Sequence, residues 1–465
     1  MGNSAMTTIT ETNGNEKGEI GASLKKFFAD YRIAGLLKLC RAEKQKGHPA
    51  LDIFRYLLCL VLCDRSMYMQ VHTGRLDESF GKNTVYRFLN SARTNWERLV
   101  CIISERIING TIRRLTAPDR KDAFIIDDTL FSRTGGKKTQ LCSRVFDHAA
   151  MKMKAGFRLL TLGWTDGETF VPVLSRLLGS SSGKNIIGPR VKTDARSLAG
   201  KRRAQALRKA PDVAVEMLRA ALKAGHRAKY VLFDTWFSTP RGILRITREC
   251  KLHVIAMIIK APKVFYEFEG EKKNLKQIYG ACKKRCGRAR FLLSVTVSIL
   301  ENGKAVIPAR IVCVRNRNNR KDWIAFICTD MSLSEEEIVT VYGKRWKIEV
   351  FFKTCKSMLN LGSECHSLSY DALTAHVSLV FIRYMLLALQ KRLCEDGRSF
   401  GELFFSVVDE IADISFDSAI RLIIDLLLQS VKEVFGFADS KLDMLVDDFR
   451  QKLPPCYQRA LRCAA

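Results

Sequence analysis

The sequence predicts an α/β protein in which a mixed core lies between two helical regions. The pattern is helical throughout from Ala22 to about Leu115, and it is helical again beyond Leu361. Between residues 118 and 259, short apolar strands alternate with amphipathic helices in the order three strands, helix, strand, helix, strand. Residues 260 to 330 change to alternating strands with basic loops, which indicates a small, mostly β insertion.

The charge balance indicates the class of partner. The 465 residues carry 77 Lys and Arg against 48 Asp and Glu, a formal net charge of +29. Such an excess indicates a polyanion, with nucleic acid as the first candidate and an anionic membrane surface as the second. The basic clusters fall largely in loops rather than on a basic amphipathic helix, so we expect no membrane partner. The most apolar stretch, Ala372–Gln390, still contains His376 and Arg383.

The cysteines indicate a reducing compartment. The 15 Cys are odd in number and lie mostly inside apolar runs, which is typical of buried thiols in a cytosolic protein. The closest pair, Cys282 and Cys286, has no second Cys or His pair at zinc-site spacing, so a metal knuckle there is the weaker alternative.

The N-terminal helical region contains a candidate DNA-reading helix. After Gly81, the segment Lys82–Asn90 has Asn or Thr as its expected N-cap and basic residues in its first turns. Preceded by a loop and a shorter helix, it fits the recognition helix of a helix-turn-helix, with Lys82 and Arg87 as DNA contacts. An ordinary small helix of an all-α bundle fits as well.

The core strands place acidic residues at their ends. Ala123–Ile126 is a buried strand expected to end on Asp127-Asp128-Thr129. Two more strands, Gly156–Trp164 and Thr169–Leu174, are joined by a hairpin signal at Thr165–Glu168. The remaining elements are a helix, a strand that leads to Asp234, a helix and a strand: Ala210–Ala224, Lys229–Phe233, Thr239–Glu249 and Leu252–Ile259.

A polar stripe is predicted on the helix that follows the insertion. Ser332 or Ser334, each with Glu three residues later, is expected to start a helix that continues to Lys356. Four polar side chains then fall within a stripe about 60° wide between apolar neighbours: Tyr342, Arg345, Glu349 and Lys356. Such groups are costly to bury unless they pair or bind something. The alternative, an exposed helix with spaced ion pairs, would not need the apolar flanks.

Three carboxylates fit a metal site. Asp127 and Asp234 each follow a four-residue apolar strand, and side by side they would repel unless a divalent cation lay between them. Glu349 completes a set of hard oxygen ligands suited to Mg²⁺ or Mn²⁺. A single strand-terminal Asp is often only a cap, but the three together favour the metal site.

These residues also carry a resemblance to a known family. The spacing Tyr342-x2-Arg345-x3-Glu349-x6-Lys356 resembles the signature of the insertion-sequence-four family of DDE transposases. Asp127-Asp128-Thr129 resembles the first acidic block of that family, and Tyr230–Phe237 resembles the second. The resemblance covers roughly residues 120–360. It implies a ribonuclease-H-like catalytic core with a β-rich insertion between the second Asp and the Glu.

The resemblance also implies roles for individual residues. Asp127, Asp234 and Glu349 would be the catalytic triad and would bind two Mg²⁺ ions, for which Mn²⁺ would substitute. Tyr342, Arg345 and Lys356 would contact phosphates near the transposon end. Trp323 would stack on a base flipped out of the duplex, as in hairpin-forming members. The alternative for Trp323 is a core Trp in a strand.

The implied activity is cut-and-paste transposition in a bacterial cytoplasm, on the nucleoid. The partners would be double-stranded DNA, as terminal inverted repeats and as target, and a second copy of the chain in a homodimer. Two alternatives stay open: a nuclease or resolvase on the same fold, which would not need the stripe in register, and an inactive transposase that only binds DNA. The basic loops Lys201–Lys209, Lys283–Arg290 and Arg315–Lys321 are candidate backbone contacts.

Six segments follow from these expectations. They are a mobile tail (1–20), a helical DNA-binding domain (21–117), the first part of the core (118–259), the β-rich insertion (260–330), the core helix with Glu349 (331–362), and a helical C-terminal region (363–465). In the last of these, Phe400–Phe449 is strongly acidic, which suits protein contact, such as dimerisation, better than DNA contact.

Overall fold

The computed structural model describes residues 25–43, 46–63, 67, 80–147, 150–180, 182–286, 289–316, 319 and 322–393. The chain forms two compact units, one of Met1–Asp30, Cys59–Leu76 and Gly397–Ala465, the other of Tyr31–Leu58 and Asp77–Asp396. Only residues 25–30, 59–63 and 67 of the first unit are described, among them η1 (Leu60–Cys63). The expected tail at 1–20 and the acidic stretch 400–449 lie outside the described residues. All the described strands belong to the second unit.

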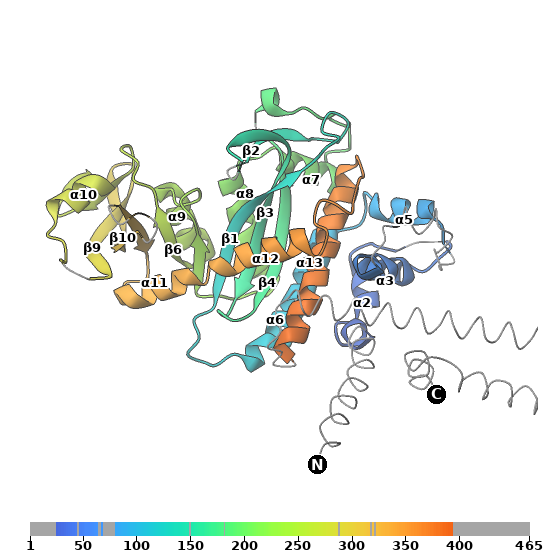
Figure 1. Ribbon diagram of the computed structural model, residues 1–465, viewed down its shortest axis with the longest axis horizontal. Helices are drawn as coiled ribbons and strands as arrows, with labels where there is room; N and C mark the ends of the chain where they lie inside the picture. The colour runs from blue at the N-terminus through green and yellow to red at the C-terminus, as the bar shows by residue number, and fades with distance from the viewer. Residues whose placement is uncertain are drawn as a thin grey trace, which may run out of the picture. The chain divides into compact units, whose positions relative to one another are not determined.

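A mixed sheet forms the framework of the second unit (Figure 1). Its strands follow the order β2-β3-β1-β5-β6-β11-β10-β9-β7-β8, and β4 pairs with β3. The core strands are β1 (Ala123–Ser132), β2 (Ser143–Asp147), β3 (Lys152–Thr165), β4 (Phe170–Leu178), β5 (Tyr230–Phe233) and β6 (His253–Ile258). β4, β3 and β1 are antiparallel neighbours, whereas β1, β5 and β6 run parallel. This arrangement confirms the predicted α/β class and is that of a ribonuclease-H-like core.

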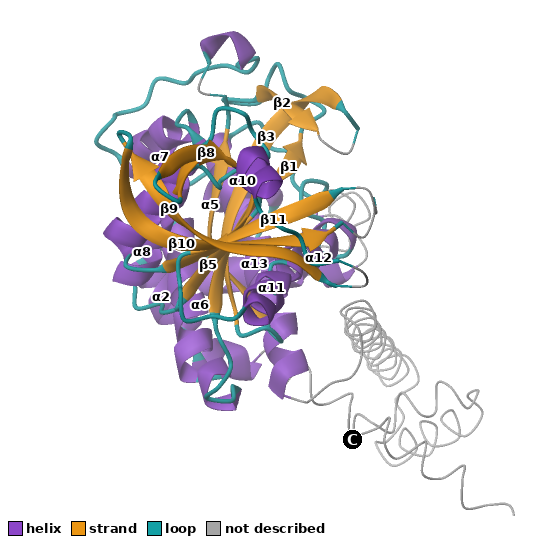
Figure 2. Ribbon diagram, turned by 90° about the vertical axis from the view of Figure 1, so that its left-hand side faces the viewer, coloured by secondary structure: helices purple, strands orange, loops and turns teal. Residues whose placement is uncertain are grey.

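The insertion continues the core sheet. It contains β7 (Phe265–Phe268), β8 (Glu271–Asn274), α10 (Leu275–Ala281), β9 (Phe291–Glu301), β10 (Lys304–Arg315) and β11 (Trp323–Cys328). β11 pairs antiparallel with β6 over Ala325–Cys328, so the two parts share one hydrogen-bonded layer. Figure 2 shows their strands as one continuous twisted sheet. The β-rich insertion is therefore present, with α10 in addition.

Helices cover both faces of the core strands. α12 (Trp346–Ser357) and α13 (Tyr370–Leu393) cross in front of β1, β3 and β4 in Figure 1, and α8 (Ala210–Lys223) lies behind them. On the front, the Phe170 ring of β4 lies 5.0 Å from Phe351 of α12 and 6.3 Å from Tyr384 of α13, measured between ring centroids. Strands covered on both faces are apolar throughout rather than alternating, as the fully buried run Ala123–Ile126 illustrates.

α13 is long and apolar enough to cross a membrane by length and composition, but 94% of its most apolar window is buried inside the protein. Its polar side chains have partners. Arg383 donates to Glu364 at 2.7 Å and 3.0 Å, and His376 accepts a hydrogen bond from the Gly362 amide at 3.2 Å. Buried charge that is paired in this way is typical of the central helix of a globular core.

The second unit also contains further helices. They are α2 (Ile33–Leu39), α3 (Ala50–Cys59), α5 (Lys82–Leu89), α6 (Trp96–Gly110), η2 (Ile112–Leu115), η3 (Gly183–Asn185), α7 (Leu198–Ala206), α9 (Pro240–Arg245), η4 (Ile246–Cys250) and α11 (Glu335–Gly343). At α5, the expected Asn or Thr N-cap is wrong. Gly81 is the N-cap, in extended conformation and without a side-chain bond, so Asn83 and Thr84 lie in the first turn.

Candidate active site

The pairing of β1 with β5 brings two of the predicted carboxylates together. The parallel register joins Ala123 to Tyr230 and Ile125 to Leu232. The same offset, continued by two residues, places Asp127 level with Asp234, the first residue after β5. The expectation that the first strand ends at Asp127 is wrong, because β1 continues to Ser132 along β3. Asp127 thus lies at the level where β5 ends. Beyond this level β1 is paired with β3 on one edge and is no longer paired with β5 on the other.

The pKa of Asp127 reflects this position. The pKa is raised to about 7, chiefly by burial; the Arg345 guanidinium lowers it, and the nearby charge of Asp234 raises it. The Asp127 carboxylate accepts a hydrogen bond from the Asp128 amide at 2.8 Å. Asp234 accepts one from the Trp236 amide at 3.0 Å, which fixes its carboxylate at the start of the loop after β5. Two carboxylates held in this way favour a cation between them.

The predicted single helix across Tyr342–Lys356 is wrong, since two helices lie there. α11 begins at Glu335 after its N-cap Ser334, whose side chain forms the expected capping box with Glu337, and it ends at Gly343. The backbone amides of Lys344 and Arg345 then bond to carbonyls three residues back, which tightens the chain before α12 begins at Trp346. The ammonium group of Lys344 donates to the Lys121 and Asp166 carbonyls and holds this junction against the sheet.

Arg345 joins Asp127 to Glu349. Its Nη1 donates to Asp127 Oδ2 at 2.9 Å, and its Nη2 donates to Glu349 Oε1 one turn further along the chain. The Arg345 side chain is 16% exposed, so this ion pair is largely withdrawn from water. One guanidinium therefore occupies the space between two of the three predicted metal ligands.

Tyr342 and Lys356 lie beside this pair. The Tyr342 ring packs on Phe326 with centroids 4.6 Å apart, and the Arg345 guanidinium lies 6.0 Å from the Tyr342 ring centre. Lys356 Nζ donates to Thr129 Oγ1 at 2.6 Å. Because alternate residues of a strand share a face, Thr129 and Lys356 lie on the same side of β1 as Asp127. Their predicted phosphate contacts stay predictions.

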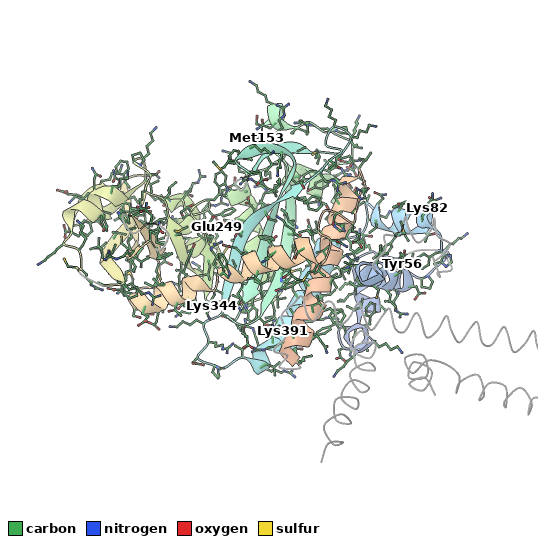
Figure 3. All side chains as sticks on the ribbon, viewed as in Figure 1. Tyr56, Lys82, Met153, Glu249, Lys344 and Lys391 are labelled. Carbon is green, nitrogen blue, oxygen red and sulfur yellow. The ribbon has the colours of Figure 1, made fainter. Side chains whose placement is uncertain are left out.

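The other predicted DNA contacts lie elsewhere. Trp323 starts β11 in the insertion, where its ring stacks on Tyr279 at 4.1 Å and 11°, with Lys260 Nζ 4.3 Å from its centre. Lys82 and Arg87 lie on the exposed face of α5 together with Tyr86. Figure 3 shows Lys82 on α5, beyond α13 from α12 in that view. No hydrogen bond or ion pair of the described residues links these three to the carboxylates.

The donor set fits a divalent cation in kind. Carboxylate oxygens are the ligands that Mg²⁺ and Mn²⁺ prefer, and Asp127 on β1 lies level with Asp234, the residue that follows the adjacent strand β5. However, no group of three His, Cys, Asp or Glu side chains within the described ranges is already arranged around one metal position. The Arg345 guanidinium supplies the balancing positive charge to Asp127 and Glu349 instead.

A second cluster at the same strand was not predicted from the sequence. Asp128 pairs with Arg158 of β3 at 2.9 Å, and the Arg158 guanidinium lies 4.7 Å from the centre of the half-exposed Trp236 ring. Asp128 alternates with Asp127 and so faces the opposite side of the sheet. The signal was available in part, because Trp236 lies two residues after Asp234 in the second acidic block.

A ribonuclease-H-like sheet with acidic residues at the β1–β5 junction defines an α/β protein of the nuclease or transposase type. The chain belongs to the DDE superfamily endonuclease family, whose model matches residues 52–301. The match includes Asp127 and Asp234 and ends before Glu349. It confirms the DDE transposase-type family, implies DNA as the substrate and agrees with a requirement for divalent metal ions. No curated protein matches the chain.

Proposed function

We propose that the protein is a transposase that cleaves DNA at the terminal inverted repeats of a mobile element and joins the ends to target DNA. The observation that carries the proposal is the meeting of three elements at one place. β1 and β5 bring Asp127 level with Asp234, and Arg345 ties Asp127 to Glu349 on α12. Membership of the DDE endonucleases supports DNA as the substrate.

Asp127, Asp234 and Glu349 would hold two divalent cations, Mg²⁺ or in its place Mn²⁺. When bound, such ions lower the pKa of an attacking hydroxyl and neutralise charge on the leaving oxygen. Asp127 lies on β1 between β3 and β5 and would be held there as a metal ligand by the sheet. Asp234 accepts the Trp236 amide through Oδ1, so Oδ2 would be the oxygen that binds an ion.

Arg345 and Lys356 would bind phosphate oxygens beside the scissile bond. The guanidinium offers two parallel donors and the ammonium a point charge, and both lie on the Asp127 side of β1. Arg345 has to leave at least one carboxylate to reach a phosphate. Tyr342 supports the guanidinium through its ring.

The finer assignment is to the insertion-sequence-four family, on the spacing of Tyr342, Arg345, Glu349 and Lys356. Its cut-and-paste route would pass through a DNA hairpin, with Trp323 as platform for a flipped base. In the structure, Tyr279 stacks on the Trp323 ring and Lys260 Nζ lies 4.3 Å from its centre, so a flipped base would have to displace one of these two neighbours. Lys82 and Arg87 on α5 would contact the terminal repeat, and the working form would be a homodimer in a bacterial cytoplasm.

The test is cleavage of supercoiled plasmid that carries the DNA flanking this gene, with Mg²⁺ or Mn²⁺. Wild type is set beside Asp127→Asn and Asp128→Asn. Asp128 is the matched control, because it is the next carboxylate on the same strand but pairs with Arg158 on the opposite face. We expect metal-dependent breaks at the repeat boundaries, lost with Asp127→Asn and kept with Asp128→Asn.

Two results would change the assignment. Wild-type cleavage by Asp127→Asn removes Asp127 from the triad. Specific binding to the repeats without cleavage in either metal leaves a DNA-binding protein that is no longer an active transposase.

A further inference from the structure

Two segments far apart in the sequence form one lobe beyond the end of β1. The lobe consists of residues 133–155 and 182–201, of which all but 148–149 are described. The Ile187 amide donates to the Cys142 carbonyl at 2.8 Å, and the Leu141 amide donates to the Pro189 carbonyl at 3.1 Å. At Gly188 a Cβ would lie 1.8 Å from the Thr139 carbonyl oxygen, so only glycine permits this approach. Figure 3 marks the lobe at Met153.

The lobe is strongly basic. It contains eleven Lys and Arg against two Asp. Eight of these basic side chains are exposed and form no ion pair or side-chain hydrogen bond within the described part of the chain: Lys137, Lys138, Arg144, Lys152, Lys184, Arg190, Lys192 and Lys201. Like charges gathered without partners repel one another at low salt, and a polyanion removes that cost.

Basic residues outside the lobe often have a carboxylate partner. Arg245 pairs with Asp212 at 2.6 Å, Arg248 with Glu301 at 2.6 Å, and Arg285 with Glu335. In the same region as the lobe, Arg202 and Arg203 are buried and bind Asp371 at 2.6 Å and 2.8 Å. These two cannot contact a DNA backbone as the sequence suggested for Lys201–Lys209. Exposed lysines without a carboxylate partner also lie outside the lobe, for example Lys223, Lys251 and Lys276, but the lobe gathers eight such basic residues in two short segments.

The lobe is continuous with the candidate active site. β1 carries Asp127 and enters the lobe after Ser132, five residues further on, which is roughly 17 Å of strand. Lys356, bonded to Thr129, lies between the two. At about 3.4 Å per nucleotide, this separation corresponds to roughly five nucleotides of a DNA strand.

We infer that the lobe is a second nucleic-acid-binding surface, which binds the phosphate backbone of duplex DNA about five base pairs from the scissile bond. It is distinct from α5, and its placement relative to the scissile bond rests on the proposed function. The ligand chemistry is that of phosphodiesters in a duplex, read by charge rather than by base.

The test measures binding of the full-length protein to a duplex at several salt concentrations. The lobe variant is Lys137→Gln/Lys138→Gln/Lys152→Gln. The matched control is Lys223→Gln/Lys251→Gln/Lys276→Gln, three exposed lysines outside the lobe. We expect the lobe variant to lower the slope of log K against log salt by about 3 and to weaken binding at 0.1 M salt by more than about tenfold. The control should keep the wild-type slope, and both variants should keep the wild-type melting temperature.

The outcomes separate the lobe from the proposed function. The inference is overturned if the lobe variant keeps the wild-type slope of log K against log salt, or if lobe variant and control lose DNA affinity equally. Either result counts even if the wild type cleaves DNA. A lower slope of log K against log salt in the lobe variant, but not in the control, supports DNA binding by the lobe even if no cleavage is found. Unchanged DNA binding combined with lost binding to phosphatidylserine vesicles would assign the lobe to an anionic membrane instead and overturn the inference. With cleaving protein, hydroxyl-radical footprints should lose protection about five nucleotides from the break.

Discussion

Replacing Arg345 with Met should make the protein bind Mn²⁺ more tightly in the absence of DNA. The change keeps a long side chain but removes the guanidinium that donates to both Asp127 and Glu349. In the wild type, a cation that uses these carboxylates has to displace Arg345 first. In the variant, the carboxylates repel one another without a partner, and the ion relieves that repulsion.

The size of the effect follows from the two bonds. A hydrogen bond between charged groups contributes about 1.5–3 kcal/mol when buried. Glu349 is 33% exposed, so its bond is discounted for screening by water. Together the two hydrogen bonds from Arg345 stabilise the metal-free state by about 2 kcal/mol. Their loss therefore corresponds to about a thirtyfold change in the dissociation constant of Mn²⁺.

The assay is a titration of full-length protein with Mn²⁺, followed by the electron paramagnetic resonance signal of the free ion. It is run near pH 8.5, where Asp127 is ionised in the wild type. Arg158→Met serves as the control, since Arg158 binds Asp128 on the opposite face of β1. An affinity in Arg345→Met equal to or weaker than that of the wild type would refute the reasoning, whether or not the protein cleaves DNA.

Three further predictions concern protons and the helix junction. Because burial raises the pKa of Asp127 to about 7, Mn²⁺ affinity should fall about tenfold for each pH unit below 7, and a flat profile would contradict this. Burial lowers the pKa of His226 from 6.5 to about 4, so its contribution to stability is complete above pH 6.5 and is lost as pH falls toward 4. Urea unfolding should show a loss of about 3 kcal/mol over that range, absent in His226→Gln. Lys344→Met should cost about 1–3 kcal/mol of stability and slow single-turnover cleavage, because two backbone carbonyls lose their hydrogen-bond donor. Lys347→Met is the control. Equal effects of the two substitutions would argue against a role for the α11–α12 junction.

Two acidic residues of the candidate site, Asp127 and Asp234, could be predicted because each follows an apolar run. The run Ala123–Ile126 before Asp127 and the run Tyr230–Phe233 before Asp234 are fully buried, as their composition indicated. What the sequence could not show is that the first strand continues past Asp127. That depends on pairing with β3, whose residues follow some thirty positions later, and no local signal marks where one neighbour stops and another continues.

The break between α11 and α12 had only a weak local signal. The stripe of Tyr342, Arg345, Glu349 and Lys356 fits one continuous helix, and within it Gly343, where α11 ends, is the residue that disfavours continuation. The break coincides with Lys344, whose ammonium group is held by the carbonyls of Lys121 and Asp166, far away in the sequence. The surroundings of Trp323 were also not predictable, because its stacking partner Tyr279 comes from α10, a helix that the alternating pattern of the insertion did not reveal.

The position of Arg345 reconciles its predicted role with the observed one. Phosphate and carboxylate are both oxyanions that accept two donors from a guanidinium, so the same side chain can serve either. A phosphate that draws Arg345 away from Asp127 and Glu349 would leave those carboxylates open to a divalent cation. Binding free energies are reciprocal, so an ion that displaces Arg345 would free the guanidinium for phosphate by the same factor. Metal and DNA would then be expected to strengthen each other's binding through Arg345. This coupling requires Arg345 to reach Glu349, which its position four residues earlier on the helix allows.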